Sequence, residues 1–131
     1  MSDEKIVFVS KEEALELHHD SIEKFGGSYG LRDRGAFESA LNAAENRHHY
    51  ENANLTVCAG TYAFHLCQAH AFVDGNKRIA AAVSILLLRR NGAKIEASIK
   101  ELIELFLKIA AGEITREAVE QFFAENVKIQ S

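Results

Sequence analysis

Apolar side chains recur every three or four residues through most of this chain, a spacing that places them on one face of a helix. The first such row contains Leu15, His18, Ile22 and Phe25. Ser10 and Glu13, just ahead of it, have the pattern of a capping box, in which each side chain bonds to the other residue's backbone N–H. Gly26 and Gly27 are residues that commonly end a helix. A first helix is therefore predicted between these signals, after a short strand at residues 5–9.

The middle of the chain predicts two more helices. Residues 26–34 are rich in glycine and polar side chains, which favours a loop or a small hairpin. Asp33 can cap a second helix, whose inner face would carry Phe37, Ala40, Leu41 and Ala44. Residues 46–54 are polar and are predicted to connect this helix to a third one at about residues 53–68.

Residues 79–88 are hydrophobic almost all round, which in a water-soluble protein predicts a central helix that others surround. Asn91 and Gly92 mark its end. Ser98 opens a second capping box, ahead of a helix that Gly112 closes, and Thr115 can cap the last helix. The inner faces of these two helices would carry Leu102, Leu105, Phe106, Ile109, Val119, Phe122 and Phe123. The pattern predicts an all-α fold, a compact helical bundle around a buried central helix with a small β-hairpin flap.

Composition narrows the class of protein. The 131 residues suit one domain spanning 1–131, and the absence of proline is consistent with close-packed helices. No apolar stretch reaches the roughly 18 residues that cross a bilayer, and the first residues lack the layout of a signal peptide, so the cytoplasm is the expected location. A formal net charge of −4 with scattered basic residues argues against nucleic acid as a direct partner.

The segment before residues 79–88 combines several chemical groups. A helix N-terminus has unpaired N–H groups and partial positive charge, so it can bind phosphate. Gly75 would let a ligand approach the backbone, and Asn76 can cap the helix and tolerates left-handed geometry. Lys77 and Arg78 add cations where the helix dipole disfavours them, which suggests a polyphosphate ligand. The alternative interpretation is a turn with an N-cap and two solvated cations.

Two more side chains complete this set. Asp74 offers a carboxylate, and Mg²⁺ beside phosphate oxygens typically takes one or two of these from the protein. His70 has a side chain suited to act as a general base toward a hydroxyl near neutral pH. A base, a metal ligand and an anion site within nine residues are the components of phosphoryl or nucleotidyl transfer.

The same nine residues resemble the signature of the Fic/Doc superfamily, His-x-Phe-x-Asp/Glu-Gly/Ala-Asn-Gly/Lys-Arg. They are His70, Ala71, Phe72, Val73, Asp74, Gly75, Asn76, Lys77 and Arg78. Lys77 is the Doc-like form, since AMP-transferring relatives have glycine there and a second arginine where this chain has Ala81. Ala71 replaces a proline that is frequent in the family. Residues 30–35 and 38–41 resemble a further Doc-family stretch, and the likeness runs over about residues 9–92.

The resemblance implies a role for each matching residue. His70 would deprotonate a hydroxyl of the target protein, and Asp74 would bind magnesium. Gly75, Asn76, Lys77 and Arg78 would hold the phosphates of ATP, with Lys77 and Arg78 counted among the catalytic residues. Gly30, Leu31 and Arg32 would lie in a flap that aligns the substrate.

The resemblance also implies a function. A Doc-like toxin transfers a phosphate from a nucleoside triphosphate to a protein substrate, such as a translation factor, and a small antitoxin neutralises it. The alternatives are AMP transfer, as in most Fic relatives, and a non-catalytic module that only binds an antitoxin. No segment resembles the internal inhibitory helix of some Fic proteins, so inhibition by a separate protein is expected.

Overall fold

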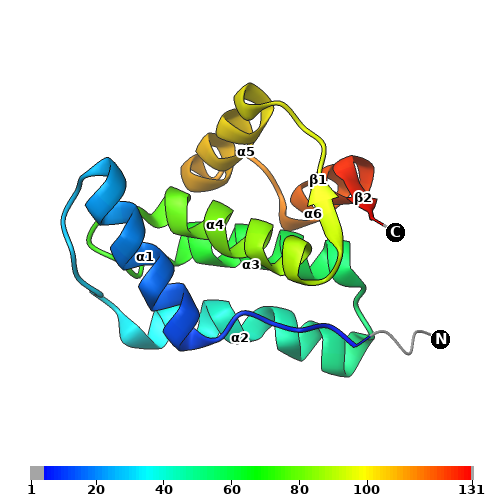
Figure 1. The fold of residues 1–131 in the computed structure, drawn as a ribbon, viewed down its shortest axis with the longest axis horizontal. Coiled ribbons are helices and arrows are strands. Elements are labelled where there is room, and N and C mark those ends of the chain that lie inside the picture. Colours follow the sequence, from blue (N-terminus) through cyan, green and yellow to red (C-terminus); the bar gives the residue numbers. More distant parts are fainter. Residues whose placement is uncertain (1–4, 131) are drawn as a thin grey trace.

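The structure is a computed structural model that describes residues 5–130 (Figure 1). Over this range the chain forms six helices and two short strands. The elements are α1 (Lys11–Phe25), α2 (Arg34–Glu51), α3 (Leu55–Ala69), α4 (Asn76–Arg90), β1 (Ala93–Ile95), α5 (Ile99–Ala111), α6 (Arg116–Asn126) and β2 (Val127–Ile129). The predicted helical fold is confirmed.

Local capping signals locate the starts of the helices. The hydroxyl of Ser10 accepts from the Glu13 backbone N–H at 3.1 Å, and the Ser98 hydroxyl accepts from that of Glu101 at 3.0 Å, so both predicted capping boxes are confirmed. Asp33 caps α2 as predicted, at 3.0 Å from Oδ1 to the backbone nitrogen of Ala36. Thr115 caps α6 as predicted, and the predicted glycines follow the ends of α1 and α5.

The most enclosed helix is α3, which contacts α2, α4, α5 and α6. Its small residues allow this close packing, since a Cβ added to Gly60 would lie 3.2 Å from the Cα of Glu120 on α6. Helix α4 is also surrounded, as predicted for residues 79–88, since it packs against α1, α3, α5 and β1. It is less enclosed than α3, because Ala81, Ala82 and Leu86 remain only half-buried.

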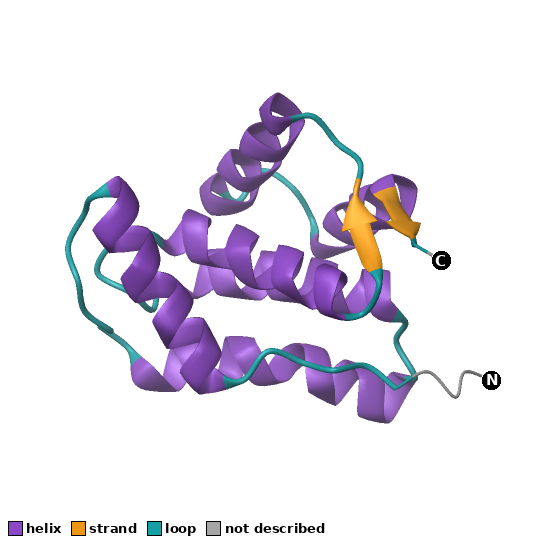
Figure 2. Ribbon diagram, viewed as in Figure 1, coloured by secondary structure: helices purple, strands orange, loops and turns teal. Residues whose placement is uncertain are grey.

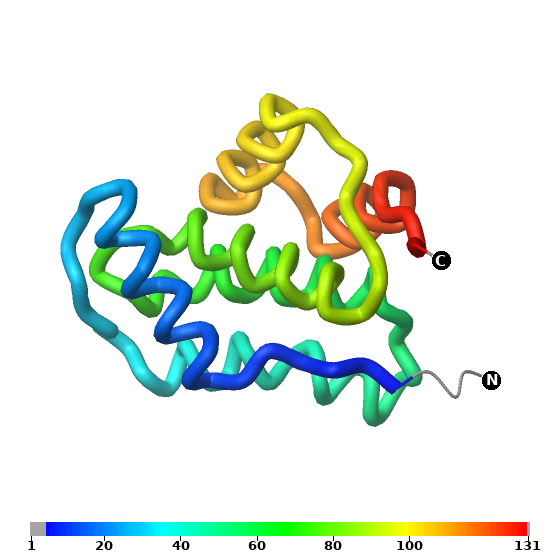
Figure 3. Tube along the Cα trace, viewed as in Figure 1, coloured from blue at the N-terminus to red at the C-terminus, as the bar shows by residue number. Residues whose placement is uncertain are grey.

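Two predictions about connecting segments were wrong. Residues 5–9 form no strand but an extended segment ahead of α1 (Figure 3). Side chains satisfy its backbone, because Val9 N–H donates to the Tyr62 hydroxyl at 3.2 Å and Val7 N–H to the Asn91 amide at 2.8 Å. Residues 46–51 continue α2 instead of forming a connection, since the polar side chain of Arg47 pairs with Glu120 of α6.

The β structure also differs from the prediction. Strands β1 and β2 pair antiparallel, with Ala93 opposite Ile129 and Ile95 opposite Val127 (Figure 2). Residues 26–33 form a loop, the first of the two predicted possibilities, and no hairpin; their one β-bridge joins Leu31 to Phe72, in the segment between α3 and α4. We keep the name flap for residues 26–33, which lie against that segment. None of the helices within residues 5–130 is both long enough and apolar enough to cross a membrane.

Candidate active site

The candidate site is the connection between α3 and α4, which we call the active loop (residues 70–75). His70 ends α3 in the left-handed backbone region, at φ 48°, and Gly75 precedes α4 at φ 77°. Two left-handed residues reverse the chain within a few positions. The six residues between the helices therefore fold back to the amino end of α4.

The Asn76 side chain holds this reversal in place. Its Oδ1 accepts from the Phe72 N–H and its Nδ2 donates to the Phe72 carbonyl, each at 3.0 Å. Asn76 was predicted to cap α4, and this expectation was wrong. Gly75 occupies the N-cap in the left-handed region, whereas Asn76 is already helical and its amide faces the loop.

The flap is hydrogen-bonded to the active loop. Arg32 N–H donates to the Ala71 carbonyl at 2.7 Å, and Val73 N–H donates to the Gly30 carbonyl at 3.0 Å. These bonds flank the Leu31–Phe72 bridge, so the N–H and C=O of Leu31 point away from the loop. The Arg32 guanidinium also donates to the His70 carbonyl at 2.7 Å. All three predicted flap residues thus lie against the active loop, and Arg32 contacts the predicted base.

The Asp74 carboxylate is exposed at the start of α4. Its Oδ1 accepts from Gly75 N–H at 3.0 Å, and its Oδ2 accepts from Ser28 N–H at 3.2 Å. Ser28 lies in the flap, so the carboxylate joins both segments. Gly27 makes room for this contact, because a Cβ there would lie 2.8 Å from Asp74 Oδ2.

The amino end of α4 has no side-chain cap, whereas the other five helices within residues 5–130 have one. The intrahelical ladder begins where Ile79 N–H donates to the Gly75 carbonyl at 3.0 Å. The N–H groups of Asn76, Lys77 and Arg78 precede that ladder and are available to an anion. The positive end of the helix dipole adds to this preference.

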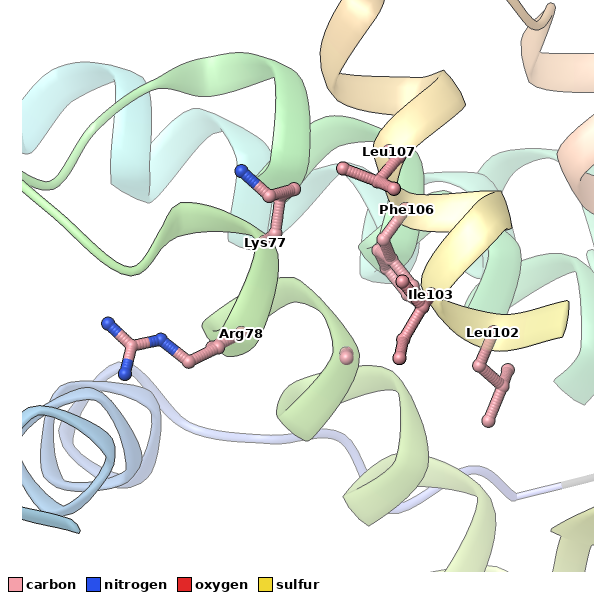
Figure 4. Close-up of a pocket in the computed structure, with 7 residues that line it drawn as sticks. Lys77, Arg78, Leu102, Ile103, Phe106 and Leu107 are labelled. Carbon is pink, nitrogen blue, oxygen red and sulfur yellow. The ribbon is translucent and has the colours of Figure 1, made fainter. Parts of the chain in front are cut away.

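The two cations after Asn76 have different environments (Figure 4). Lys77 is exposed. Arg78 points to the end of α1, where Nη2 donates to the Gly26 carbonyl at 2.9 Å and the guanidinium lies 6.0 Å from the Phe25 ring centroid. In the sequence, Arg78 has no evident structural role. The structure supplies one, because cations are favoured near the carbonyls at a helix C-terminus.

A cleft of about 250 Å³ lies between α4 and α5 beside Lys77 (Figure 4). Its walls are almost entirely apolar and come from Lys77, Arg78, Ala81, Leu102, Ile103, Phe106 and Leu107. The sequence analysis had assigned Leu102 and Phe106 to the core only. The cleft was not predictable, because it depends on how far α5 lies from α4.

The donors at this site fit a magnesium ion that phosphate oxygens help to hold. Asp74 contributes one exposed carboxylate next to the uncapped α4 N-terminus. No group of three or more His, Cys, Asp or Glu side chains within residues 5–130 forms a complete metal cage. A single carboxylate beside an anion site is the arrangement that Mg²⁺ uses with nucleotides.

His70 is exposed, and its imidazole hydrogen-bonds to no other residue in the range 5–130. A base that must meet a substrate hydroxyl needs such access. Cys67 is the nucleophilic side chain nearest in sequence, but burial raises its thiol pKa to about 11. The thiol therefore stays protonated at neutral pH, and His70 is the better candidate.

The sequence analysis missed two residues that contact the active loop. The buried His18 of α1 reaches the Asp74 carbonyl, and the Ser28 backbone reaches the Asp74 carboxylate. A histidine within the apolar row of α1 was the available signal for the first. The second is a main-chain contact, for which the sequence contains no signal.

Comparisons with known proteins cover this whole region. The model of a family described as the Fic/DOC family matches residues 8–88, which include the flap and the active loop. The protein kinase doc of Escherichia phage P1 is 36% identical over 112 residues, which make up 85% of this chain and 88% of that protein. The match to the family model covers more than half of the chain and confirms the family that the signature at residues 70–78 predicted. The chain belongs to the Fic/DOC family.

Proposed function

We propose that this protein is a Doc-like toxin that transfers the γ-phosphate of ATP to a hydroxyl of a target protein. The observation that carries the proposal is the exposed Asp74 carboxylate beside the uncapped amino end of α4. That pair suits a metal-bound polyphosphate. The similarity to a phage protein named as a protein kinase favours phosphate transfer over AMP transfer.

His70 is the proposed general base. Its imidazole would take the proton of the target hydroxyl as the hydroxyl oxygen bonds to the γ-phosphorus. The bond from that phosphorus to the bridging oxygen then breaks, and ADP leaves. Arg32 supports this role, because its bond to the His70 carbonyl restrains the backbone of the base.

The negative charge of the phosphates would be neutralised at the start of α4. A bound magnesium ion would neutralise phosphate charge, and Asp74 is the residue that would hold it. The N–H groups of Asn76, Lys77 and Arg78 point to the same end of the helix, and the absence of a side chain at Gly75 leaves the backbone accessible. Lys77 adds an exposed ammonium, whereas Arg78 would exchange the Gly26 carbonyl for a phosphate oxygen.

The flap would align the substrate. The outward N–H and C=O of Leu31 form an open edge, and an extended peptide can add to such an edge as a strand. A target hydroxyl in that peptide would lie near His70, because Gly30 and Arg32 bond to the active loop on either side of Leu31.

The proposed partners are a protein substrate, such as a translation factor, and a small antitoxin. The apolar cleft between α4 and α5 supports an antitoxin segment that packs as a helix in a groove. Ile103 and Leu107 extend its apolar wall onto the exposed surface, at 55% and 52% exposure. An Ile103→Glu variant should lose binding to the product of a neighbouring short reading frame while keeping transferase activity. Retained binding would contradict this location.

Labelled ATP tests the reaction. The protein is incubated with a bacterial extract and ATP carrying label at either the α- or the γ-phosphate. Label from the γ position on a protein is expected, whereas label from the α position would instead establish AMP transfer. His70→Asn is the control, because asparagine tolerates left-handed backbone but cannot act as this base. A His70→Asn protein that labels targets and arrests growth as wild type does would contradict both enzymatic readings and favour a binding module.

A further inference from the structure

His18 is a buried polar residue of α1 for which the proposed reaction has no use. His18 is only 4% exposed and lies on the apolar face of α1 that packs against the core. Burying an imidazole is unfavourable unless its polar atoms find partners. Its hydrogen bond and its ring contact both lead to the active loop, 56 and 54 positions later in the chain.

Two contacts connect His18 to that loop. The ring stacks on Phe72, with 3.8 Å between centroids and 19° between planes. Its Nε2 lies 2.7 Å from the Asp74 carbonyl oxygen. A carbonyl oxygen can only accept, so Nε2 carries the proton in this hydrogen bond.

These contacts are placed where the loop changes direction. Phe72 is the residue whose backbone the Asn76 amide holds, and Asp74 immediately precedes the left-handed Gly75. Gly75 packs against the same ring, since a Cβ there would lie 3.4 Å from His18 Nε2. The His18 imidazole thus contacts the loop at Phe72, Asp74 and Gly75, whereas the flap bonds to it at other residues, Arg32 to His70 and Ala71 and Gly30 to Val73.

We propose that His18 is a positioning residue, whose Nε2–H bond to the Asp74 carbonyl sets the direction of the Asp74 side chain at the α4 N-terminus. It acts through Asp74 and touches no reacting atom. The expected effect of this residue on kcat rests on the proposed function, whereas its expected effect on the loop conformation can be measured without nucleotide.

Two substitutions separate the hydrogen bond from the stacking. His18→Phe keeps a flat ring against Phe72 but removes the donor. His18→Gln removes the ring but keeps an N–H at nearly the same reach. The same changes at His65, a half-buried histidine of α3, are the matched controls for loss of an imidazole.

The first measurement is the ¹H–¹⁵N spectrum of the ligand-free variants. His18→Phe, which keeps an aromatic ring beside Gly75, is expected to move the amide resonances of Gly75 and Asn76, whereas both His65 variants leave them near their wild-type positions. This measurement decides the inference even if the wild-type protein transfers no phosphate, a result that would remove only the proposed function. Unchanged loop resonances in His18→Phe would overturn the inference.

The second measurement is kinetic. Misplacing a catalytic group by about 1 Å can cost on the order of 100-fold, so His18→Phe should lower kcat by about 10- to 100-fold with little change in the KM for the protein substrate. Affinity for a non-hydrolysable ATP analogue with Mg²⁺ should fall in parallel in a calorimetric titration. His18→Gln should restore kcat to within about threefold of wild type. A glutamine variant as impaired as the phenylalanine variant would show that the donor is not what positions the loop.

Discussion

At the scale of single residues, Gly75 combines a left-handed backbone with close neighbours on all sides of its missing Cβ. Its φ of 77° lies in the region that residues with a Cβ disfavour, and Arg78, His18 and Ile22 surround the space where a Cβ would be. Gly112 has a similar φ of 72°, yet no atom lies within 4 Å of its Cβ position. The two glycines share a backbone cost and differ in their surroundings.

Replacing each glycine with alanine should therefore separate the effect on unfolding free energy from the effect on nucleotide binding. Both variants should lose about 1 kcal/mol of unfolding free energy from left-handed strain. Only Gly75→Ala should also weaken binding of ATP with Mg²⁺, because its Cβ displaces Arg78 and His18. Urea unfolding and calorimetric titration measure the two effects. Equal nucleotide affinity in both variants would show that the space around Gly75 does not matter for binding and that only its left-handed backbone requires glycine.

The residues of the active loop and of the first turn of α4 could be picked out from the sequence, but several of their contacts could not. His70, Asp74 and Lys77 lie within eight consecutive positions, so their combination is visible in the sequence. The bond from His18 to Asp74 spans 56 positions, and the bond from Arg78 to Gly26 spans 52. Such pairs form only after α1 packs on α4, and no local pattern indicates them.

At the scale of elements, the start of α1 contains a charge pair that pH can test. Both Glu13 oxygens accept from Arg90 of α4, at 2.8 and 2.5 Å. The bonds from Arg90 and, next, from the Ser10 backbone lower the Glu13 pKa from 4.5 to about 2. A carboxyl with a lowered folded-state pKa stabilises the fold above its unfolded pKa, and this contribution is lost as the pH falls through the folded value.

Glu13→Gln should remove the charge pair and keep the capping box, since glutamine also serves at this position. At pH 7 the loss of unfolding free energy should be about 1 kcal/mol or less, because the carboxylate is partly exposed. The difference from wild type should shrink as the pH falls from about 4.5 toward 2. Urea unfolding at several pH values measures it, with Glu101→Gln in the other capping box as control. A difference that stays constant with pH would exclude the charge pair as its origin.

Helix starts were the most predictable elements, since a cap such as Ser98 contacts a backbone only three residues away. Strands β1 and β2 were missed because three residues each are too few to establish an alternation. The continuation of α2 through residues 46–51 was missed for a different reason. Its polar residues resemble a loop until α6 supplies a partner.

At the scale of the whole molecule, Arg47 joins α2, α3 and α6. Its guanidinium pairs with Glu120 and donates to the Thr61 hydroxyl at 3.2 Å, and its side chain is 17% exposed. It also pairs with Glu51 at 3.4 Å, but the Glu51 side chain is 61% exposed. One arginine thus has an enclosed carboxylate partner and a solvated one.

Glu120→Ala should cost about 2 kcal/mol of unfolding free energy, because it leaves a mostly buried guanidinium without its main partner. Glu51→Ala should cost less than about 0.5 kcal/mol, as is usual for exposed pairs. Thermal and urea unfolding of both variants measure the contrast. Similar losses would mean that the enclosed pair does not hold α6 to α2.

Residues just after α1 already hydrogen-bond to Arg78 and Asp74, two side chains that the proposed reaction needs for the nucleotide. The Gly26 carbonyl accepts from Arg78, and the Ser28 N–H donates to Asp74. An incoming nucleotide therefore exchanges one set of hydrogen bonds for another, and its net affinity is the difference between them. Part of that difference is entropic, because residues 26–28 regain freedom once they are released. The loosening of this short segment would then accompany every turnover, and amide hydrogen exchange at Ser28 would report it.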